Sequence, residues 1–151
     1  MADIVDRATR GRMMAGIRGQ NTVPEVTLRR GLHSAGLRFR LHSKELPGKP
    51  DLVFPKYHAA IFVNGCFWHA HECPLFRWPS TRTKFWKTKL LENRKRDFRV
   101  RGELISLGWR YLVVWECTMK NKSTFEINQI IRQVATWIRK GSPPTELPPA
   151  S

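Results

Sequence analysis

The sequence predicts a single α/β domain in which a mixed central sheet is flanked by helices. The prediction comes from segments with helix-start signals, from short apolar runs of strand length, and from their order. That order is helix, three strands, helix, strand, helix, and it favours one mixed sheet with helices packed on it. A length of 151 residues fits one domain with a buried core. The chain has neither an internal repeat nor a linker long enough to separate two domains.

The first helix is expected to begin at Thr22, and local chemistry marks both of its ends. Thr22 can cap the helix, Pro24 suits its first turn, and Glu25 completes a capping box. Gly36 is expected to end it. Residues 37–41 then alternate apolar and basic side chains, which predicts a half-buried strand.

The middle of the chain predicts a hairpin, a long helix and a further strand. Two short apolar runs, residues 51–54 and 59–63, are expected to pair around a turn at 55–58. Residues 84–107 are predicted to form a long polar helix that ends before a glycine. Residues 111–115 are apolar throughout, which predicts a buried strand.

The last helix is expected to cover residues 123–140. Ser123 and Glu126 form a second capping box at its start, and isoleucine and valine recur along it at helical spacing. Residues 141–151 are Pro-rich and are expected to be a disordered tail. The expected organisation is therefore an arm at 1–21, a folded domain at 22–140 and a tail at 141–151.

The charge of the chain points to a polyanionic partner. Lys and Arg number 27 against 12 acidic residues, which gives a formal net charge of +15. Basic residues recur from Arg7 to Lys140, so the charge is not one tail. Such an excess exceeds what solubility needs and favours nucleic acid through counterion release. No apolar run approaches the roughly 20 residues of a membrane span, and the N-terminus lacks a signal peptide, so no membrane partner is expected.

The stretch from residue 63 to 73 concentrates groups that bind metals. Three cysteines cannot all pair with one another, so metal ligation is favoured over a disulfide framework. Cys66, His71 and Cys73 supply three N and S ligands, and Cys117 is the only cysteine left to be a fourth. Four protein ligands predict a closed, structural zinc site. The alternative is that the cysteines are small apolar groups in a core.

Asp51 and His69 are the candidates for chemistry. Asp51 starts a strand beside the hairpin that leads to the cysteine loop, and a carboxylate there suits Mg²⁺, which prefers oxygen ligands. Glu25 is placed to add an outer-sphere contact. His69 is open to three interpretations: metal ligand, core histidine, or catalytic base oriented by Asp97. Acidic residues usually face solvent, so this hypothesis depends on the fold bringing these groups together.

Phe67, Trp68 and Trp86 form the other unusual set. Most aromatic side chains pack in cores, and the tryptophans of the last strand and the last helix fit that pattern. Phe67 and Trp68 are adjacent, so on an extended loop they are not expected to point into one core together. Such rings can stack on bases or wedge between base pairs. Met14 and Ile17 of the arm are candidates for a second wedge.

Several uncommon motifs follow one another along the chain. They are Asp3 with Ala8-Thr9-Arg10, Pro47-Gly48-Lys49-Pro50-Asp51, Gly65-Cys66-Phe67-Trp68-His69 with His71 and Cys73, Thr81-Arg82-Thr83-Lys84-Phe85-Trp86, Arg96-Asp97, and Leu107-Gly108-Trp109-Arg110 with Val114-Trp115-Glu116-Cys117. In these motifs the chain resembles the very-short-patch-repair (Vsr) family of DNA mismatch endonucleases. The resemblance runs from the N-terminus to about Cys117, and beyond it only the last helix is comparable.

The resemblance implies a restriction-endonuclease-like core of the PD-(D/E)xK class. It implies a Mg²⁺-dependent enzyme that nicks one strand of double-stranded DNA 5′ to the thymine of a T:G mismatch, which forms when 5-methylcytosine deaminates. Residues 1–21 would then be a DNA-contacting arm and residues 22–140 the endonuclease domain. We also expect a monomer in the bacterial cytoplasm that contacts mismatch-repair proteins.

The resemblance also implies roles for individual residues. Asp51 would bind Mg²⁺ with the main-chain carbonyl of Val63, Glu25 would act from the outer sphere, and His69 paired with Asp97 would be the general base. The implied zinc ligands are Cys66, His71, Cys73 and Cys117. The implied DNA contacts are Phe67, Trp68 and Trp86 from the major groove, Met14 and Ile17 from the minor groove, and Lys89.

Two positions, Val63 and Asn64, depart from the family pattern, which has Thr and His there. Valine can still offer its carbonyl, whereas Asn64 can hold water but cannot titrate. Two alternatives therefore stay open. One is a related nicking nuclease with a different DNA target. The other is a zinc-braced DNA-binding module with a lapsed nuclease centre, which Asn64 alone favours.

Overall fold

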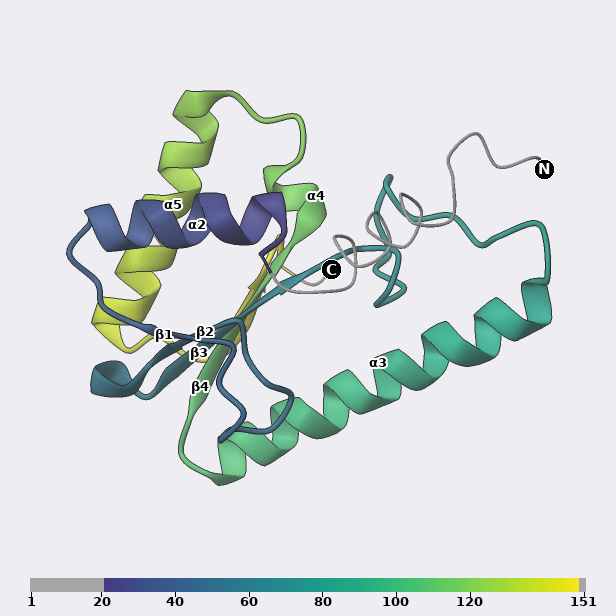
Figure 1. The fold of residues 1–151 in the computed structure, drawn as a ribbon, viewed down its shortest axis with the longest axis horizontal. Helices are drawn as coiled ribbons and strands as arrows, with labels where there is room; N and C mark the ends of the chain where they lie inside the picture. Colours follow the sequence, from purple (N-terminus) through teal and green to yellow (C-terminus); the bar gives the residue numbers. More distant parts are fainter. Residues whose placement is uncertain (1–20, 150–151) are drawn as a thin grey trace.

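The computed structural model describes residues 21–149, which form a five-stranded mixed sheet flanked by helices (Figure 1). The elements in chain order are α2 (Val23–Ser34), β1 (Arg40–Leu41), β2 (Leu52–Phe54), the 3₁₀ turn η1 (Pro55–Tyr57), β3 (Ala59–Asn64), α3 (Thr83–Ser106), β4 (Arg110–Trp115), α4 (Glu116–Met119), α5 (Thr124–Lys140) and β5 (Thr145–Leu147). The expected arm, with Met14 and Ile17, lies outside the described residues apart from its last position.

The sheet has the order β1-β2-β3-β4-β5 and changes direction in its middle. β1, β2 and β3 pair antiparallel, which confirms the predicted hairpin, whereas β3, β4 and β5 run parallel. The long connection through α3 makes the parallel pair possible, because such strands need a crossover. The β3–β4 register ends with Asn64 opposite Trp115, so the loops that leave both strands start side by side.

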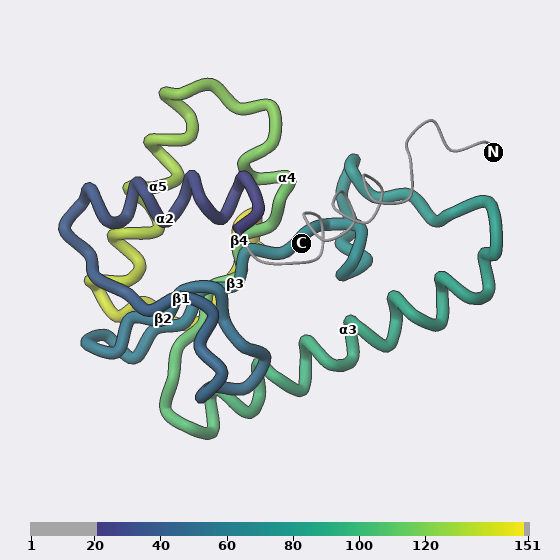
Figure 2. The backbone as a smooth tube through the Cα atoms, viewed as in Figure 1, coloured from purple at the N-terminus to yellow at the C-terminus, as the bar shows by residue number. Residues whose placement is uncertain are grey.

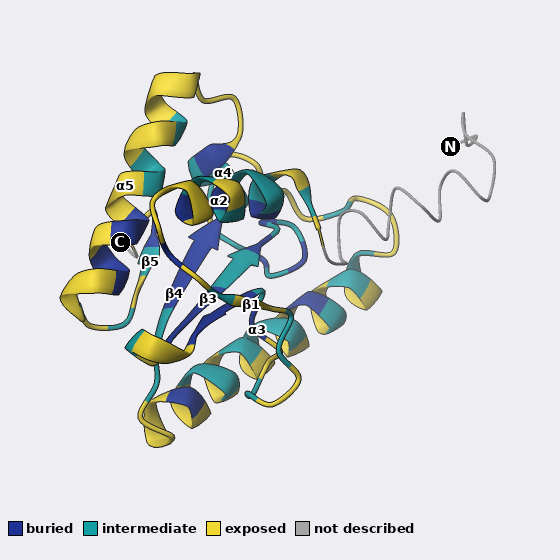
Figure 3. Ribbon diagram, turned by 60° about the vertical axis from the view of Figure 1, so that its left-hand side comes forward, coloured by how far each residue is buried: buried dark blue, intermediate teal, exposed yellow. Residues whose placement is uncertain are grey.

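The two faces of the sheet carry different cores because successive side chains of a strand point to opposite faces. Leu112 and Val114 of β4 pack with the buried sides of α2 and α5. Val113 and Trp115 face the other way and pack around Cys66. Figure 3 shows the strands buried between these layers, and Figure 2 shows the chain leaving β3 and returning along α3. The α3 side of the sheet therefore carries the cysteine loop.

The helix starts follow the sequence closely. The capping box of Ser123 and Glu126 is confirmed at α5. At α2 the Thr22 hydroxyl accepts from the Glu25 N–H at 3.4 Å, as expected, but the Glu25 carboxylate accepts from the N–H of Asn21 instead of that of Thr22. The predicted capping box is therefore only half formed, and the Glu25 carboxylate has other partners.

Two predictions at the sheet edges are wrong. The expected strand at 37–41 shrinks to Arg40–Leu41, because the pairing with the three-residue strand β2 involves only these two residues, opposite Val53 and Leu52. The tail from residue 141 is not entirely disordered: Thr145–Leu147 forms β5 and pairs with Leu112–Val114. The backbone groups on the outer edge of β4 need partners, and the end of α5 brings this segment beside them.

Arg110 fixes the chain between the end of α5 and the start of β5. Its guanidinium donates hydrogen bonds to the carbonyls of Trp137, Ile138 and Ser142 at 3.0–3.1 Å. It also donates to the carbonyl of Tyr57, in η1, at 3.2 Å. It therefore ties the C-terminal end of α5 to η1 and directs the following residues along β4. Within residues 21–149, none of the helices is long and apolar enough to span a lipid bilayer.

Candidate active site and metal centre

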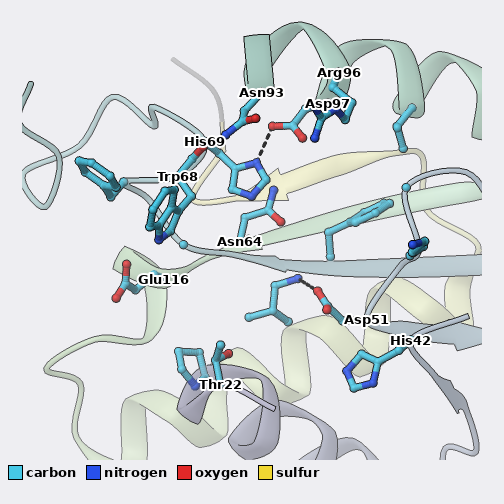
Figure 4. A pocket seen from close by; sticks show the side chains of 18 of the residues that line it. Thr22, His42, Asp51, Asn64, Trp68, His69, Asn93, Arg96, Asp97 and Glu116 are labelled. Carbon is cyan, nitrogen blue, oxygen red and sulfur yellow. Dashed lines mark hydrogen bonds and ion pairs between the residues drawn. The ribbon is translucent and has the colours of Figure 1, made fainter. Parts of the chain in front are cut away.

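A cavity of about 600 Å³ opens at the C-terminal end of β3 (Figure 4). Its walls come from the start of α2, the end of β3, the loop that follows β3, and the middle of α3. The predicted residues that line it are Asp51, Val63, Asn64, Phe67, Trp68, His69 and Asp97. The fold thus brings together side chains from segments far apart in the sequence.

Asp51 lies on the floor of this cavity, immediately before β2. Its Oδ2 atom accepts the backbone N–H of Val63 at 2.7 Å, which fixes the carboxylate against β3. The pKa of the Asp51 carboxyl is raised from its ordinary 3.8 to about 6, chiefly by burial; the nearby Glu25 charge contributes to this rise, and the hydrogen bond from the Val63 N–H opposes it. A carboxylate that is this costly to ionise alone is suited to a cation, which favours the charged form.

Glu25 lies close to Asp51 and is almost fully buried, with 1% of its side chain exposed. One carboxylate oxygen, Oε2, lies 2.9 Å from Nη1 of Arg29 and 2.7 Å from Nε2 of His42. The ligand atoms of Glu25, His42 and Asp51 all lie within 4.8 Å of one another. The fold thus brings Glu25 to Asp51, as the outer-sphere role predicted for Glu25 requires, and that role stays a prediction.

His42 was not among the residues predicted from the sequence. Its backbone N–H donates to the Asp51 carbonyl at 3.0 Å, which extends the β1–β2 pairing by one step. The register of Leu41 opposite Leu52 places His42 across from Asp51, and that register was the signal that could have found it. A single histidine in a polar turn gives no other sequence signal that it belongs to the site.

His69 and Asp97 meet on the opposite wall of the cavity. The Nδ1 atom of His69 lies 2.6 Å from Oδ2 of Asp97, and about a quarter of each side chain is exposed, 26% and 22%. Asn93, one turn earlier on α3, donates from its amide to the carbonyl of Trp68 at 3.0 Å and holds the loop beside the helix. The pairing expected for His69 and Asp97 is present.

Asn64 is the last residue of β3 and is buried, with 9% of its side chain exposed. Figure 4 shows its amide and the His69 ring pointing into the same part of the cavity. An amide at this position can donate and accept hydrogen bonds but carries no proton that titrates near neutral pH. His69 is therefore the imidazole that faces this part of the cavity from the loop.

Cys66, His71, Cys73 and Cys117 come together on the far side of the same loop. Their ligand atoms all lie within 4.8 Å of one another, so the cluster can hold a metal ion. The three cysteines are free thiols, and the Nδ1 atom of His71 lies 3.6 Å from Sγ of Cys117. The chemistry of these donors fits Zn²⁺, which takes four N and S ligands in structural sites.

The surroundings of the cluster hold its donors in place. The ring of His71 stacks on Trp115 with centroids 4.0 Å apart, and the N–H of Cys117 points at Sγ of Cys66 at 3.4 Å. Burial raises the pKa of the Cys66 and Cys117 thiols and lowers the pKa of His71. Buried thiols without a cation thus stay protonated, and a bound metal ion is what would stabilise them as thiolates.

The aromatic set is arranged differently from the expectation. Phe67 and Trp68 do pack into one cluster together with Trp86 of α3, with ring centroids 5.1–5.9 Å apart. The prediction that adjacent rings would not share a core is wrong because the loop is not extended. It turns sharply, with the N–H of Ala70 donating to the Phe67 carbonyl. Trp68 is buried, at 6% exposure, whereas Phe67 and Trp86 are half-buried. Lys89 lies on α3 one turn after Trp86.

Comparison with known proteins finds a matching family and several related proteins. The family described as DNA mismatch endonuclease Vsr matches residues 2–75. The DNA mismatch endonuclease Vsr of Escherichia coli K12 is 42% identical over 138 residues, which cover 91% of this chain and 88% of that protein. The type II nicking enzyme V.XorIIP of Xanthomonas oryzae is 44% identical, over 83% of this chain and 93% of that protein.

The type II nicking enzyme V.NmeAIP of Neisseria meningitidis is 38% identical, over 89% of this chain and 97% of that protein. Similarity at this level, over most of the length of both chains, shows that this chain is a DNA endonuclease. The chain belongs to the Vsr family of DNA mismatch endonucleases.

Proposed function

We propose that this chain is a Mg²⁺-dependent endonuclease that nicks one DNA strand 5′ to the thymine of a T:G mismatch arising from 5-methylcytosine deamination. The observation that carries the proposal is that Asp51 and the His69–Asp97 pair face each other across one cavity. Hydrolysis of a phosphodiester needs an activated water and neutralisation of phosphate charge. The His69–Asp97 pair on one wall would activate the water, and Asp51 on the other wall would hold the ion that neutralises the phosphate charge.

Asp51 and the main-chain carbonyl of Val63 are the groups that would hold Mg²⁺, with Glu25 in the outer sphere. When bound there, the ion would offset negative charge on the scissile phosphate. Mg²⁺ is bound through one or two carboxylates and keeps several waters, and the cavity beside Asp51 has room for them. Asn64 can hold one such water by its amide.

His69 would act as the general base. Its Nδ1–H donates to Asp97, which fixes the neutral tautomer that has its lone pair on Nε2. The Nε2 atom would then take the proton from the attacking water, and the Asp97 carboxylate would stabilise the imidazolium that forms. Asp97 acts through His69 and serves as the positioning residue of the pair.

The Cys66, His71, Cys73 and Cys117 cluster would hold a structural Zn²⁺. Four protein ligands leave no open position for a substrate, so its role would be to fix the loop. His69 lies between two of these ligands in the sequence, and the zinc would therefore also hold the proposed base in place. We further propose that the Asp51-bearing hairpin and the central strands form a PD-(D/E)xK core.

The aromatic cluster would supply the mismatch contact from the major-groove side. The half-buried rings of Phe67 and Trp86 are the accessible ones, Trp68 supports them from beneath, and Lys89 offers a charge to the DNA. Met14 and Ile17 would press in from the minor groove. A poorly stacked mismatch costs less to wedge open than a normal pair, which favours this target.

All proposed catalytic groups come from one chain, so we propose a monomer acting on double-stranded DNA in the bacterial cytoplasm. Contact with mismatch-repair proteins stays a prediction. The alternative of a different DNA target has one observation in its favour, namely that several relatives are type II nicking enzymes. Mismatches placed in different flanking sequences distinguish these targets.

The decisive experiment is a nicking assay on T:G and C:G duplexes of otherwise identical sequence, with and without Mg²⁺. Each strand carries its own end label, so that the nicked strand and position are read directly. The expected result is a nick on the thymine strand of the T:G duplex only, and only with Mg²⁺. Equal nicking of both duplexes would contradict the mismatch target, and nicking without a divalent ion would contradict the metal requirement.

A further inference from the structure

Three side chains that could hold a metal ion lie together at the base of the cavity, and the proposed reaction leaves one of them, His42, without a role. Glu25 comes from α2, His42 from the turn after β1, and Asp51 from the residue before β2. Their ligand atoms lie within 4.8 Å of one another, and both His42 and Asp51 line the cavity. The cluster therefore has an entry path and space for water.

The geometry of His42 and Glu25 is that of two ligands on one ion. The Nε2 atom of His42 lies 2.7 Å from Oε2 of Glu25. Neighbouring ligands on an octahedral ion, each ~2.1 Å from it, are roughly 3 Å apart. A small outward movement of the imidazole would thus admit an ion between these two atoms and the Asp51 carboxylate.

The supporting contacts hold the ligands before any ion arrives. Glu25 receives hydrogen bonds from the Asn21 N–H at 3.1 Å and from Arg29 at 2.9 Å, which orient its carboxylate. The backbone of His42 is paired with that of Asp51 at 3.0 Å. Ligand groups that are already fixed bind an ion with little further ordering.

We propose that Glu25, His42 and Asp51 bind a transition-metal dication such as Mn²⁺, with His42 as a direct nitrogen ligand. Mg²⁺ selects oxygen ligands, whereas a site with one imidazole and two carboxylates suits first-row transition metals. The inference rests on the proposed nuclease centre, because Asp51 is shared, and extends it: in the absence of Mg²⁺ the same carboxylate would serve a second class of ion together with Glu25 and His42. With such an ion Glu25 is a direct ligand and not an outer-sphere contact.

The test measures Mn²⁺ binding alone, without DNA, on zinc-loaded protein whose zinc content is verified before and after. Free Mn²⁺ is followed by its electron paramagnetic resonance signal. His42→Gln keeps an amide that can reach Glu25 but is a poor ligand, and it is expected to weaken Mn²⁺ binding about 10-fold or more. His58→Gln is the matched control, because His58 stacks on Trp109 and lines neither this cavity nor the cysteine cluster.

A second readout needs no variant and covers the case in which His42→Gln fails to fold. Electron spin echo measurements on wild-type protein with Mn²⁺ are expected to show coupling to an imidazole nitrogen. Equal Mn²⁺ affinity of wild type and His42→Gln, or the absence of nitrogen coupling, would overturn the proposal and leave His42 as an ion-pair partner of Glu25. Failure of the proposed function would appear separately, as loss of Mg²⁺-dependent nicking by the wild type.

Discussion

The Nδ1 atom of His69 and the Oδ2 atom of Asp97 lie 2.6 Å apart although 28 residues separate them in the sequence. The contact joins the loop that carries the cysteine cluster to the middle of α3. It therefore couples three parts of the molecule: the loop with the cysteine cluster, the long helix and the cavity above Asp51. Each part can be tested on its own.

His69→Ala is expected to lower the single-turnover rate of nicking by ~10²-fold or more while DNA affinity is retained. Asp97→Asn is expected to lower the same rate, because an amide can donate to Nδ1 and stabilise the wrong tautomer. The matched control is Glu103→Gln, an exposed acid on the same helix whose ion-pair partner among residues 21–149 is Arg99, at 3.6 Å. An unchanged rate for His69→Ala would assign the base to another group.

Asp51→Asn is expected to abolish nicking and, in Mg²⁺-free buffer, to stabilise the fold at alkaline pH. The folded-state pKa of about 6 exceeds the ordinary 3.8, so the folded protein holds this proton more tightly than the unfolded chain. The free energy of unfolding therefore falls as pH rises through that window, by up to about 3 kcal/mol, and the loss is complete above pH 6. Asparagine removes the charge and with it this cost.

Urea unfolding of wild type and Asp51→Asn at pH 5 and pH 8 measures the effect. The stabilisation is expected to be larger at pH 8, and Mg²⁺ should raise the stability of the wild type only. Glu45→Gln, an exposed acid outside the cavity, serves as the control. A variant that is less stable than wild type by the same amount at both pH values would refute the burial argument.

Cys73→Ala is expected to lower the free energy of unfolding by on the order of several kcal/mol, as loss of a structural metal does. Purified wild-type protein should contain one zinc per chain. Because His71 stacks on Trp115, removing the metal should also change tryptophan fluorescence. Glu72→Ala, at an exposed neighbouring position, should leave zinc content and stability unchanged. Wild-type protein without zinc would rule out the structural-metal interpretation.

Substitutions in the aromatic cluster are expected to show whether its rings wedge into the mismatch or only pack within the protein. Phe67→Ala should weaken binding to T:G duplexes more than to matched ones, because stacking contributes ~1–3 kcal/mol per ring, and Trp68→Ala should do the same by removing the support beneath that ring. Trp68→Ala should in addition lower stability by about 3–5 kcal/mol, since that ring is buried. Phe98→Ala, at a 64% exposed position further along α3, is the control and should do neither.

Salt dependence provides the complementary comparison. Lys87→Ala, on the exposed surface of α3, should weaken matched and mismatched duplexes by similar factors and flatten the salt dependence. Affinities for both duplexes at two salt concentrations distinguish the two kinds of contact. If Phe67→Ala and Trp68→Ala also weaken both duplexes equally, the rings are general contacts and the wedge proposal fails.

The parts of the fold that were predictable are those with local causes. The helix that starts after Ser123 and the hairpin formed by residues 52–64 follow from capping chemistry and apolar runs, and both are present. β5 was not predictable, because Thr145–Leu147 has no strand pattern of its own. It forms because the edge of β4 needs hydrogen-bond partners and Arg110 brings the chain there.

The site likewise contains some features that the local sequence predicts and others that depend on the fold. The cysteine cluster was predictable because three thiols and a nearby imidazole share one chemistry, whatever the fold. His42 became visible only when the β1–β2 register placed it opposite Asp51. The packing of Phe67 against Trp68 depends on how the loop turns, and adjacent positions in the sequence do not determine that.

The strand β5 also limits where this chain can be truncated. Its composition invites trimming after Gly141, yet that cut would remove β5 and leave Leu112, Val113 and Val114 with an open row of backbone donors and acceptors. An uncovered apolar edge of this kind recruits the same edge of another copy. A chain trimmed there is therefore expected to self-associate through the edge that β5 covers in the full chain.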